Sequence, residues 1–225
     1  MKKIVNFNDN ANIYVVLGQV GSGKTHLTLG HSGKKLVISF DGSYSTLEGQ
    51  EDTVTVVEPE LSDYNDANGF IDEIDKIANN YDLVVFDNVS ALETTLVEAI
   101  TDGKVGNNTD GRAAYGIVQK LLSKFSTWAI HYKGDVLFTL WSLVTDDGKE
   151  EPAMNAKAFN SVAGYAKLVS RTEVGFDGYS VVMNPDSRGV IKNRLADKIK
   201  KQSIKNEDYW KAIKFAKGGN SNADA

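Results

Sequence analysis

Short apolar runs alternate with segments of helical periodicity along most of the chain. The apolar, β-favouring runs are residues 13–17, 36–40, 53–57, 83–86 and 136–141. Apolar positions recur at helical spacing over residues 70–78, and residues 90–100 and 113–130 carry similar patterns. Strands that alternate with helices are typical of a mainly parallel sheet with helices on its faces. The pattern therefore predicts an α/β fold with a mainly parallel central sheet.

The C-terminal quarter of the chain has a different pattern. Residues 167–174 and 178–183 are two further β-favouring runs, separated by only a few residues. The pair Asp177-Gly178 lies between them, and Asp-Gly favours a tight hairpin. We therefore expect an antiparallel extension at the C-terminal end of the sheet.

The length of the chain, 225 residues, suits one domain. We place it at residues 12–217, with a short arm at 1–11 and a disordered Gly- and Asn-rich tail at 218–225. Two longer segments, 101–112 and 145–157, show neither period. Each follows an element at the expected carboxyl edge of the sheet, where open α/β folds bind ligands. Long loops in that position are usually functional.

The most specific motif directly follows the first apolar run. Residues 18–25 read G-Q-V-G-S-G-K-T and match the phosphate-binding loop G-x-x-x-x-G-K-[ST]. The glycines let backbone N–H groups converge on phosphate oxygens, Lys24 supplies a cation and Thr25 offers a hydroxyl to Mg²⁺. A helix expected to begin at Lys24 would point the positive end of its dipole at the same place. The residues predicted to contact ATP are Gly18, Gln19, Val20, Gly21, Ser22, Gly23, Lys24, Thr25 and His26.

A carboxylate completes the predicted metal site. The fourth apolar run is followed directly by Asp87, which is the Walker B arrangement. An acid at that strand tip can hold Mg²⁺ together with Thr25. The base that would activate water is open between Asp41, at the end of the second run, Glu48, which follows it, and no base at all.

A triphosphate site also needs cations against the charge that develops on the transferred phosphoryl group. Lys192 and Arg194 are two residues apart, so on an extended strand their side chains would point the same way. They are either an arginine-finger pair, which makes them catalytic candidates beside Lys24 and Asp87, or a surface pair on an edge strand.

Composition limits the partners and the location. The net charge of −5 gives no overall field that attracts nucleic acid, but residues 188–217 hold ten basic and three acidic side chains. That segment is either a local anion-binding end or a solvated Lys-rich helix. The absence of Cys excludes disulfides and thiolate metal sites. The longest apolar stretch, residues 136–144, is about half of a membrane span, and no secretory signal is visible. We therefore expect a cytoplasmic protein that does not enter a membrane.

Three segments together resemble the RecA-like ATPases: the phosphate loop, the strand that ends at Asp87, and the sequence K-N-R-L at residues 192–195. The last is similar to the Lys-Asn-Arg motif of the bacterial RadA branch. Size and order resemble core-only phage proteins of the nucleotide-binding or AAA type, some of which are single-strand annealing recombinases. The guanine-binding Asn-Lys-x-Asp motif of Ras-type GTPases is absent from the sequence. The resemblance covers about residues 11–195.

The resemblance implies an ATPase that forms a ring or filament and binds nucleotide between subunits. Lys192 and Arg194 would reach the nucleotide of the neighbouring subunit. The segments 101–112 and 145–157 would hold single-stranded DNA, so that the protein promotes annealing or strand exchange. Single-strand binding protein or replication proteins would be further partners, in the host cytoplasm if a phage encodes the chain.

Two departures from the family keep alternatives open. Ser43 falls near the position where RecA has its glutamate, and the segment 145–157 is acidic. One alternative is a nucleotide-gated DNA-binding module with little turnover. Another is a helicase loader or other partner-remodelling ATPase, and a small-molecule kinase is the remotest.

Overall fold

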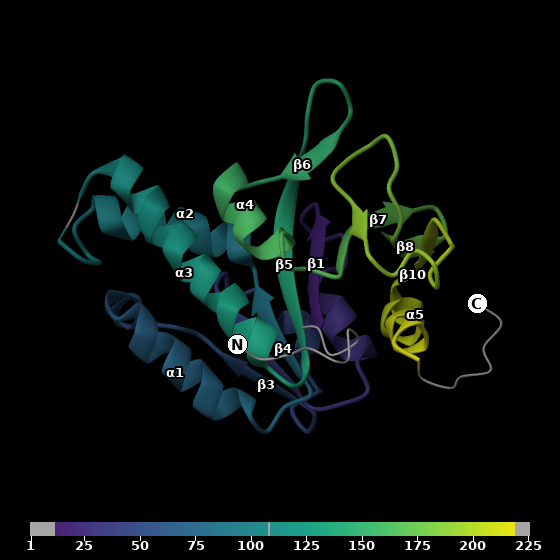
Figure 1. The fold of residues 1–225 in the computed structure, drawn as a ribbon, viewed down its shortest axis with the longest axis horizontal. Coiled ribbons are helices and arrows are strands. Elements are labelled where there is room, and N and C mark those ends of the chain that lie inside the picture. The colour runs from purple at the N-terminus through teal and green to yellow at the C-terminus, as the bar shows by residue number, and fades with distance from the viewer. Residues whose placement is uncertain (1–11, 108, 219–225) are drawn as a thin grey trace, which may run out of the picture.

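A single mixed sheet organises the residues that the computed structural model describes, 12–107 and 109–218 (Figure 1). Its strand order is β10-β8-β7-β1-β5-β4-β2-β3, with β6 paired to β5 and β9 paired to β7. The strands are β1 (Asn12–Gly18), β2 (Lys35–Ser39), β3 (Val54–Val57), β4 (Leu83–Asp87), β5 (Asp135–Val144), β6 (Glu150–Pro152), β7 (Leu168–Gly175), β8 (Gly178–Val182), β9 (Lys192–Asn193) and β10 (Ser203–Lys205).

The centre of the sheet is parallel and its C-terminal edge is antiparallel. β7, β1, β5, β4, β2 and β3 run in one direction, whereas β8, β9 and β10 pair in the antiparallel sense. β5 lies between β1, which leads into the phosphate loop, and β4, which ends in Asp87. The predicted α/β fold class, with a mainly parallel sheet and an antiparallel C-terminal extension, is confirmed.

Helices cover both faces of this sheet. In Figure 1, α1, α2, α3 and α4 lie on the left of the view, and α5 lies on the right beside β8 and β10. The helices are α1 (Ala67–Ala78), α2 (Val89–Thr101), α3 (Gly111–His131), α4 (Ala156–Ala163) and α5 (Tyr209–Ala216), with 3₁₀ turns η1 (Thr25–Gly30), η2 (Ser45–Leu47), η3 (Leu61–Asn65) and η4 (Asn206–Asp208). None of the helices in the described ranges combines the length and the apolar character that crossing a bilayer requires.

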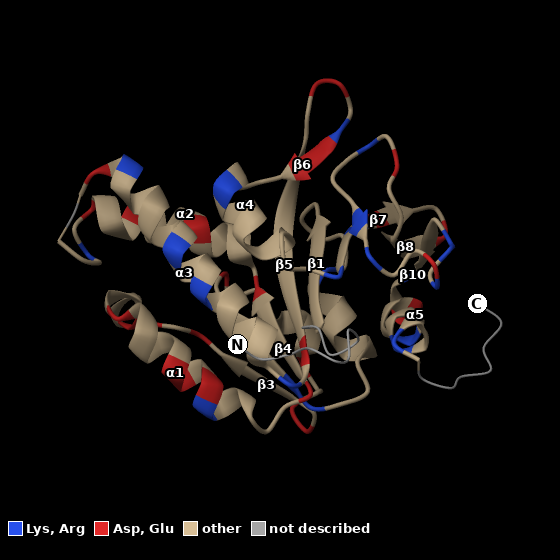
Figure 2. Ribbon diagram, in the orientation of Figure 1, with Lys and Arg blue, Asp and Glu red and all other residues tan. Residues whose placement is uncertain are grey.

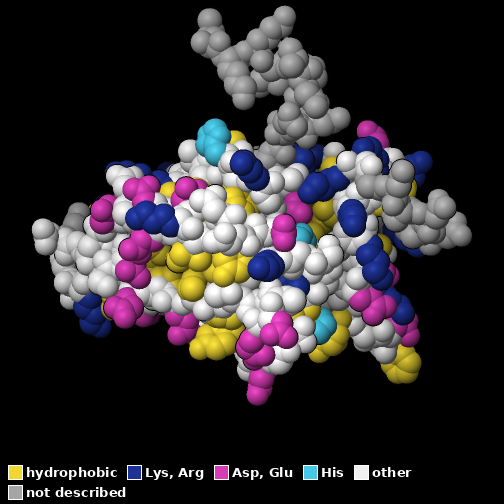
Figure 3. All heavy atoms as spheres, turned by 90° about the horizontal axis from the view of Figure 1, so that it is seen from below, with side chains coloured by type: hydrophobic (Ala, Val, Ile, Leu, Met, Phe, Trp, Pro, Cys, Tyr) yellow, Lys and Arg dark blue, Asp and Glu magenta, His cyan; other side chains and the backbone are white. Residues whose placement is uncertain are grey.

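Charge is distributed unevenly over these elements. Figure 2 shows acidic residues along α1 and at the hairpin that joins β5 to β6, and basic residues on α5. On the face seen in Figure 3, Lys and Arg side chains lie interspersed with Asp and Glu. Any attraction for a polyanion is therefore local to particular elements and is not a property of the whole surface.

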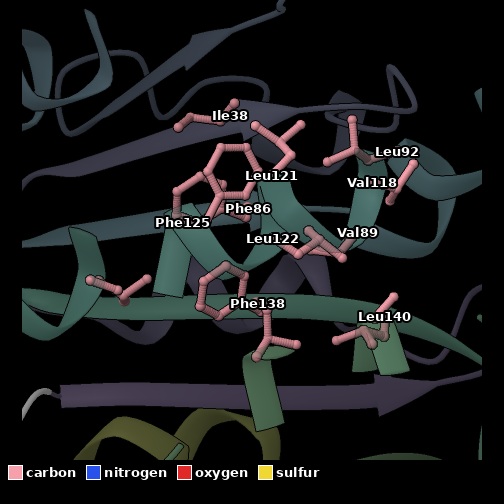
Figure 4. Close-up of a cluster of buried hydrophobic side chains, with 14 of the residues drawn as sticks. Ile38, Phe86, Val89, Leu92, Val118, Leu121, Leu122, Phe125, Phe138 and Leu140 are labelled. Carbon is pink, nitrogen blue, oxygen red and sulfur yellow. The ribbon is translucent and has the colours of Figure 1, made fainter. Parts of the chain in front are cut away.

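Alternate residues of the central strands enter two different hydrophobic clusters. Val15 packs with α1 to α4 on one face, and Tyr14 packs with η1 and α5 on the other. Phe86, Phe125 and Phe138 stack within the first cluster (Figure 4), with ring centroids of Phe86 and Phe138 4.9 Å apart. Strands buried on both faces need continuous apolar sequence, which is the pattern these runs have.

Two local predictions were wrong. The segment after the phosphate loop is the short 3₁₀ turn η1 and not a regular α-helix from Lys24. The indole N–H of Trp210 donates to the Leu27 carbonyl at 2.7 Å, and the His31 N–H bonds to Thr28 in the 3₁₀ pattern. A long-range contact thus takes a carbonyl that a continuing α-helix would use.

The segment 145–157 is also not a plain loop. It contains β6, which pairs with β5, and the first turn of α4. The Asn155 side chain accepts a hydrogen bond from the Lys157 N–H and so caps α4. The predicted arm at 1–11 and nearly all of the predicted disordered tail at 218–225 lie outside the described residues.

Candidate nucleotide site

The phosphate loop is a compact turn at the carboxyl end of β1. Gly21 and Gly23 have φ angles of +75° and +87°, which side-chain-bearing residues rarely adopt. The Ser22 hydroxyl donates to the Gln19 carbonyl at 2.7 Å and closes the turn from inside. Val20 at the tip is 83% exposed. The glycines therefore allow the bend that the motif predicted.

β7 supports the loop from behind. The Thr172 hydroxyl donates to the Leu17 carbonyl at 3.1 Å and lies 2.6 Å from the Ser22 hydroxyl. A Cβ atom at Gly18 would lie 2.0 Å from the Thr172 hydroxyl oxygen and 2.4 Å from that of Ser22. A side chain at position 18 would therefore collide with these two hydroxyls, which explains the glycine.

Lys24 is buried inside the loop that it serves. Only 7% of the residue is exposed, and its ammonium donates to the carbonyls of Gly18 and Gln19 at 2.8 Å each. Burial lowers the pKa of Lys24, although nearby acids, Asp87 first among them, oppose that shift. The loop carbonyls thus hold the ammonium where phosphate oxygens would be bound.

The side chains of Thr25 and Asp87 are in direct contact. The Thr25 hydroxyl donates to one carboxylate oxygen of Asp87 at 2.7 Å, and the Thr139 hydroxyl donates to the other. Asp87 is 3% exposed, and burial raises its pKa while the two hydroxyl bonds lower it. A carboxylate and a hydroxyl are hard oxygen ligands of the kind that Mg²⁺ prefers, so these residues fit the predicted metal.

Asp41 belongs to the same electrostatic environment as Lys24 and Asp87. The charge of Asp41 acts on the pKa of both Lys24 and Asp87. Asp41 is half-buried and its carboxylate accepts the Ser43 N–H at 2.9 Å. Glu48 is an exposed residue after η2. Of the two candidate bases, the structure brings Asp41 towards the phosphate loop.

A cluster of buried charges connects the loop to the β5–β6 hairpin. Arg171 on β7 is 1% exposed and pairs with Glu150 at 3.2 Å and with Glu173 and Asp186 at 2.7 Å. The Ser142 hydroxyl also donates to Glu150, and the charge of Glu150 reaches Lys24. The hairpin is therefore fixed beside the site by ion pairs.

The C-terminal elements form the remaining wall of the loop. The Asn206 side-chain amide donates to the Gly23 carbonyl at 3.3 Å. A Cβ atom at Gly23 would lie 3.1 Å from the ring of Tyr179 on β8. These residues come from segments more than 150 positions away in the sequence.

Lys192 and Arg194 do not join this site. Lys192 is on β9, opposite Val169 of β7, and that residue is in turn opposite Val15 of β1. The phosphate loop begins at Gly18, about 10 Å further along the strand direction. The Lys192 ammonium donates to the carbonyls of Ala163 and Gly164 at 2.9 Å, and Arg194 donates to Gly164 at 3.3 Å. Both cations lie at the C-terminal end of α4.

Sequence reasoning missed the partners that come from other strands. Thr139 is a lone polar residue within an apolar run, and that was the available signal for it. Thr172, Tyr179 and Asn206 carry no comparable signal, because their roles depend on how the sheet is ordered. His26 is exposed, and within the described ranges no group of His, Asp and Glu is arranged to hold a metal ion.

The close approach at Gly18 gives a direct test of the loop. We expect Gly18→Ala to lower the affinity for Mg-ATP at least about tenfold, since a misplaced contact in such a cradle commonly loses 1.4 kcal/mol or more. Isothermal titration calorimetry measures this affinity. Gly116→Ala on α3, where a Cβ meets no atom within 4 Å, is the matched control and should bind normally. Normal binding by Gly18→Ala would contradict the assigned geometry.

One comparison with known proteins shows the family of the chain. A model described as an AAA domain matches residues 10–195, and no curated protein matches the chain. A solved KaiC-like protein of the archaeon Pyrococcus horikoshii OT3 is similar over 81% of this chain and 83% of that chain, with 12% identity and a TM-score of 0.49. The family match contains the phosphate loop, Asp87 and Arg194. The chain belongs to the AAA domain family.

Proposed function

We propose that the protein is a Mg²⁺-dependent ATPase that binds single-stranded DNA and promotes annealing or strand exchange, with hydrolysis at a subunit interface. One observation carries the ATPase part: Lys24, Thr25 and Asp87 converge at one edge of the sheet. Lys24 would exchange its two carbonyl partners for β- and γ-phosphate oxygens. Thr25 and Asp87 would hold Mg²⁺, which neutralises phosphate charge when bound.

A shared active site is supported by the position of the two candidate finger residues. Lys192 and Arg194 lie too far along the sheet to reach the phosphates of their own chain. Arg194 is exposed, and its guanidinium donates to the Gly164 carbonyl over a long 3.3 Å. An exposed guanidinium is available to a neighbouring subunit, where an arginine finger contributes about 10³–10⁵ in rate.

DNA binding is supported by basic side chains at the opposite edge of the sheet. A cavity of about 680 Å³ there is lined by Lys133, Lys211, Lys214 and Lys217, with His31 and Trp210. Asp135 in its wall is already paired with Lys217 at 2.8 Å and His31 at 3.3 Å. By contrast, the β5–β6 hairpin is acidic (Figure 2) and repels phosphates. We therefore place the backbone contacts at the basic rim.

The DNA step predicts a salt-dependent complex. A labelled single-stranded oligonucleotide should shift in a gel with ATP and Mg²⁺ at low salt. If the protein contacts six phosphates, the affinity of the complex should fall about 10³-fold when salt rises from 50 to 200 mM. Lys133→Ala combined with Lys214→Ala should lower the salt slope by about two, one for each lost contact. Lys120→Ala, an exposed lysine on α3, is the control. No shift at low salt contradicts this part of the proposal.

If Asp41 is the base that activates water, substitution of Asp41 and of Glu48 should affect kcat differently. Asp41→Asn should lower kcat about 10²- to 10⁴-fold, because a positioned base contributes that factor, while ATP affinity is kept. Glu48→Gln should leave both unchanged. Phosphate release with and without single-stranded DNA measures kcat, and light scattering in the same samples reports assembly. Equal kcat for Asp41→Asn and wild type would mean that Asp41 is not the base.

Mixing two inactive chains tests the shared site. Lys24→Ala and Arg194→Ala should each be inactive alone and should recover partial ATPase activity when combined, because some interfaces then contain both intact residues. The control mixes Lys24→Ala with a chain that carries both substitutions, which can rebuild no interface. If activity does not recover at any mixing ratio, the shared site is wrong, and Lys192 and Arg194 serve only to cap α4.

The acidic hairpin favours a second candidate function, a helicase loader or other partner-remodelling ATPase. Asp147 at its turn is exposed, and the neighbouring Leu143 and Val144 are 63% and 56% exposed. Apolar side chains beside acids suit a basic protein partner better than DNA. Capture of a replicative helicase with no binding of naked DNA would favour this function.

A further inference from the structure

The positions of Thr25 and Asp87, the candidate metal ligands, indicate how a nucleotide would be oriented in the loop. Thr25 and Asp87 meet on the side of β1 where β5 and β4 lie, and β7 and β8 lie on the other side. Thr25 and Asp87 would hold Mg²⁺, which neutralises phosphate charge, so the terminal phosphates would lie on the Asp87 side of the loop. The nucleoside would then leave the loop towards β7 and β8.

Tyr179 is an aromatic side chain on that side of the loop. It stands on β8 opposite Val174 of β7, and a Cβ atom at Gly23 would lie 3.1 Å from its ring carbon Cδ1. The residue is nevertheless 52% exposed. One part of the ring therefore contacts the phosphate loop, and the rest is open to a ligand.

Two neighbouring elements are tied to the same loop. Asn206 donates to the Gly23 carbonyl at 3.3 Å, so η4 is tied to the same loop residue. Thr172, whose side chain leaves β7 on the same face as Val174, contacts Ser22. Tyr179 thus belongs to the wall that positions the loop and is not a remote surface residue.

We propose that Tyr179 stacks on the base of the bound nucleotide and makes the site prefer a nucleoside triphosphate to bare triphosphate. The proposal rests on nucleotide binding by the phosphate loop, as proposed above. Stacking of a base on an aromatic side chain requires only a π-face, so it contributes affinity with little discrimination among bases. Tyr179 acts as a positioning residue for the nucleoside.

Calorimetry on the full chain with two ligands tests this. Tyr179→Ala should weaken Mg-ATP binding about 5- to 150-fold, the range that loss of one stacked base gives, and should leave Mg-tripolyphosphate binding unchanged. Tyr179→Phe keeps the ring and should bind ATP normally. Phe176→Ala removes another aromatic of the same hairpin, one that is fully exposed, and is the matched control. A second measurement needs no variant: the fluorescence of a 2-aminopurine nucleoside triphosphate should fall on binding to wild type.

The outcomes separate this inference from the nucleotide site itself. Equal losses for ATP and tripolyphosphate, or no loss for ATP, would overturn the stacking role. Unquenched 2-aminopurine on wild type would overturn it as well. Failure of wild type to bind either ligand would overturn the nucleotide site and, with it, the proposed ATPase. Recovery by Tyr179→Phe, together with quenching on wild type, would establish the role.

Discussion

Two opposite charges, those of Lys24 and Asp87, are buried at one edge of the sheet, and the rest of the site depends on how they are accommodated. They are 7% and 3% exposed. Burial lowers the pKa of Lys24 and raises the pKa of Asp87, so in both cases it disfavours the charged form. Hydrogen bonds from Thr25 and Thr139 compensate the carboxylate, and loop carbonyls compensate the ammonium. Perturbed groups of this kind are typical of functional sites, since they are destabilising until a ligand supplies the missing charge.

The order of the strands makes this accommodation possible. β5 separates β1 from β4 and brings Thr139 beside Asp87, while β7 on the other side of β1 brings Thr172 behind Gly18. Asn88 caps α2 immediately after Asp87 by accepting from the Ser90 N–H at 2.9 Å, which fixes where the strand ends. Each motif residue thus has partners from elements distant in sequence.

The difference between local motifs and partners from distant elements explains what the sequence could predict. The phosphate loop, the Asp87 strand and the alternation of strands and helices follow from local patterns, and all were predicted. β6, α4 and the 3₁₀ form of η1 were not. β6 is a short charged strand, Glu150–Pro152, that lacks an apolar pattern. The start of α4 and the form of η1 depend on contacts with distant segments. The residues of the site divide in the same way. Lys24 and Thr25 can be identified from the spacing of the motif. Tyr179 lies beside Gly23 only when the β7–β8 hairpin folds against the loop, so the sequence does not reveal it.

The two cations at the end of α4 differ in a way that their shared motif conceals. Lys192 is half-buried with two carbonyl partners at 2.9 Å, and burial and Arg194 both lower its pKa. A cation at a helix C-terminus stabilises the fold by about 0.3–1 kcal/mol. Lys192 therefore has a structural role, and this stabilisation would be lost if its side chain turned away to contact another subunit. Arg194 is exposed, and its guanidinium hydrogen bond to the Gly164 carbonyl is long, 3.3 Å. A guanidinium can bind phosphate oxygens in a bidentate manner. Of the pair, Arg194 is therefore the better candidate for the proposed contact with a neighbouring subunit, and Lys192 is suited to hold the strand that carries Arg194.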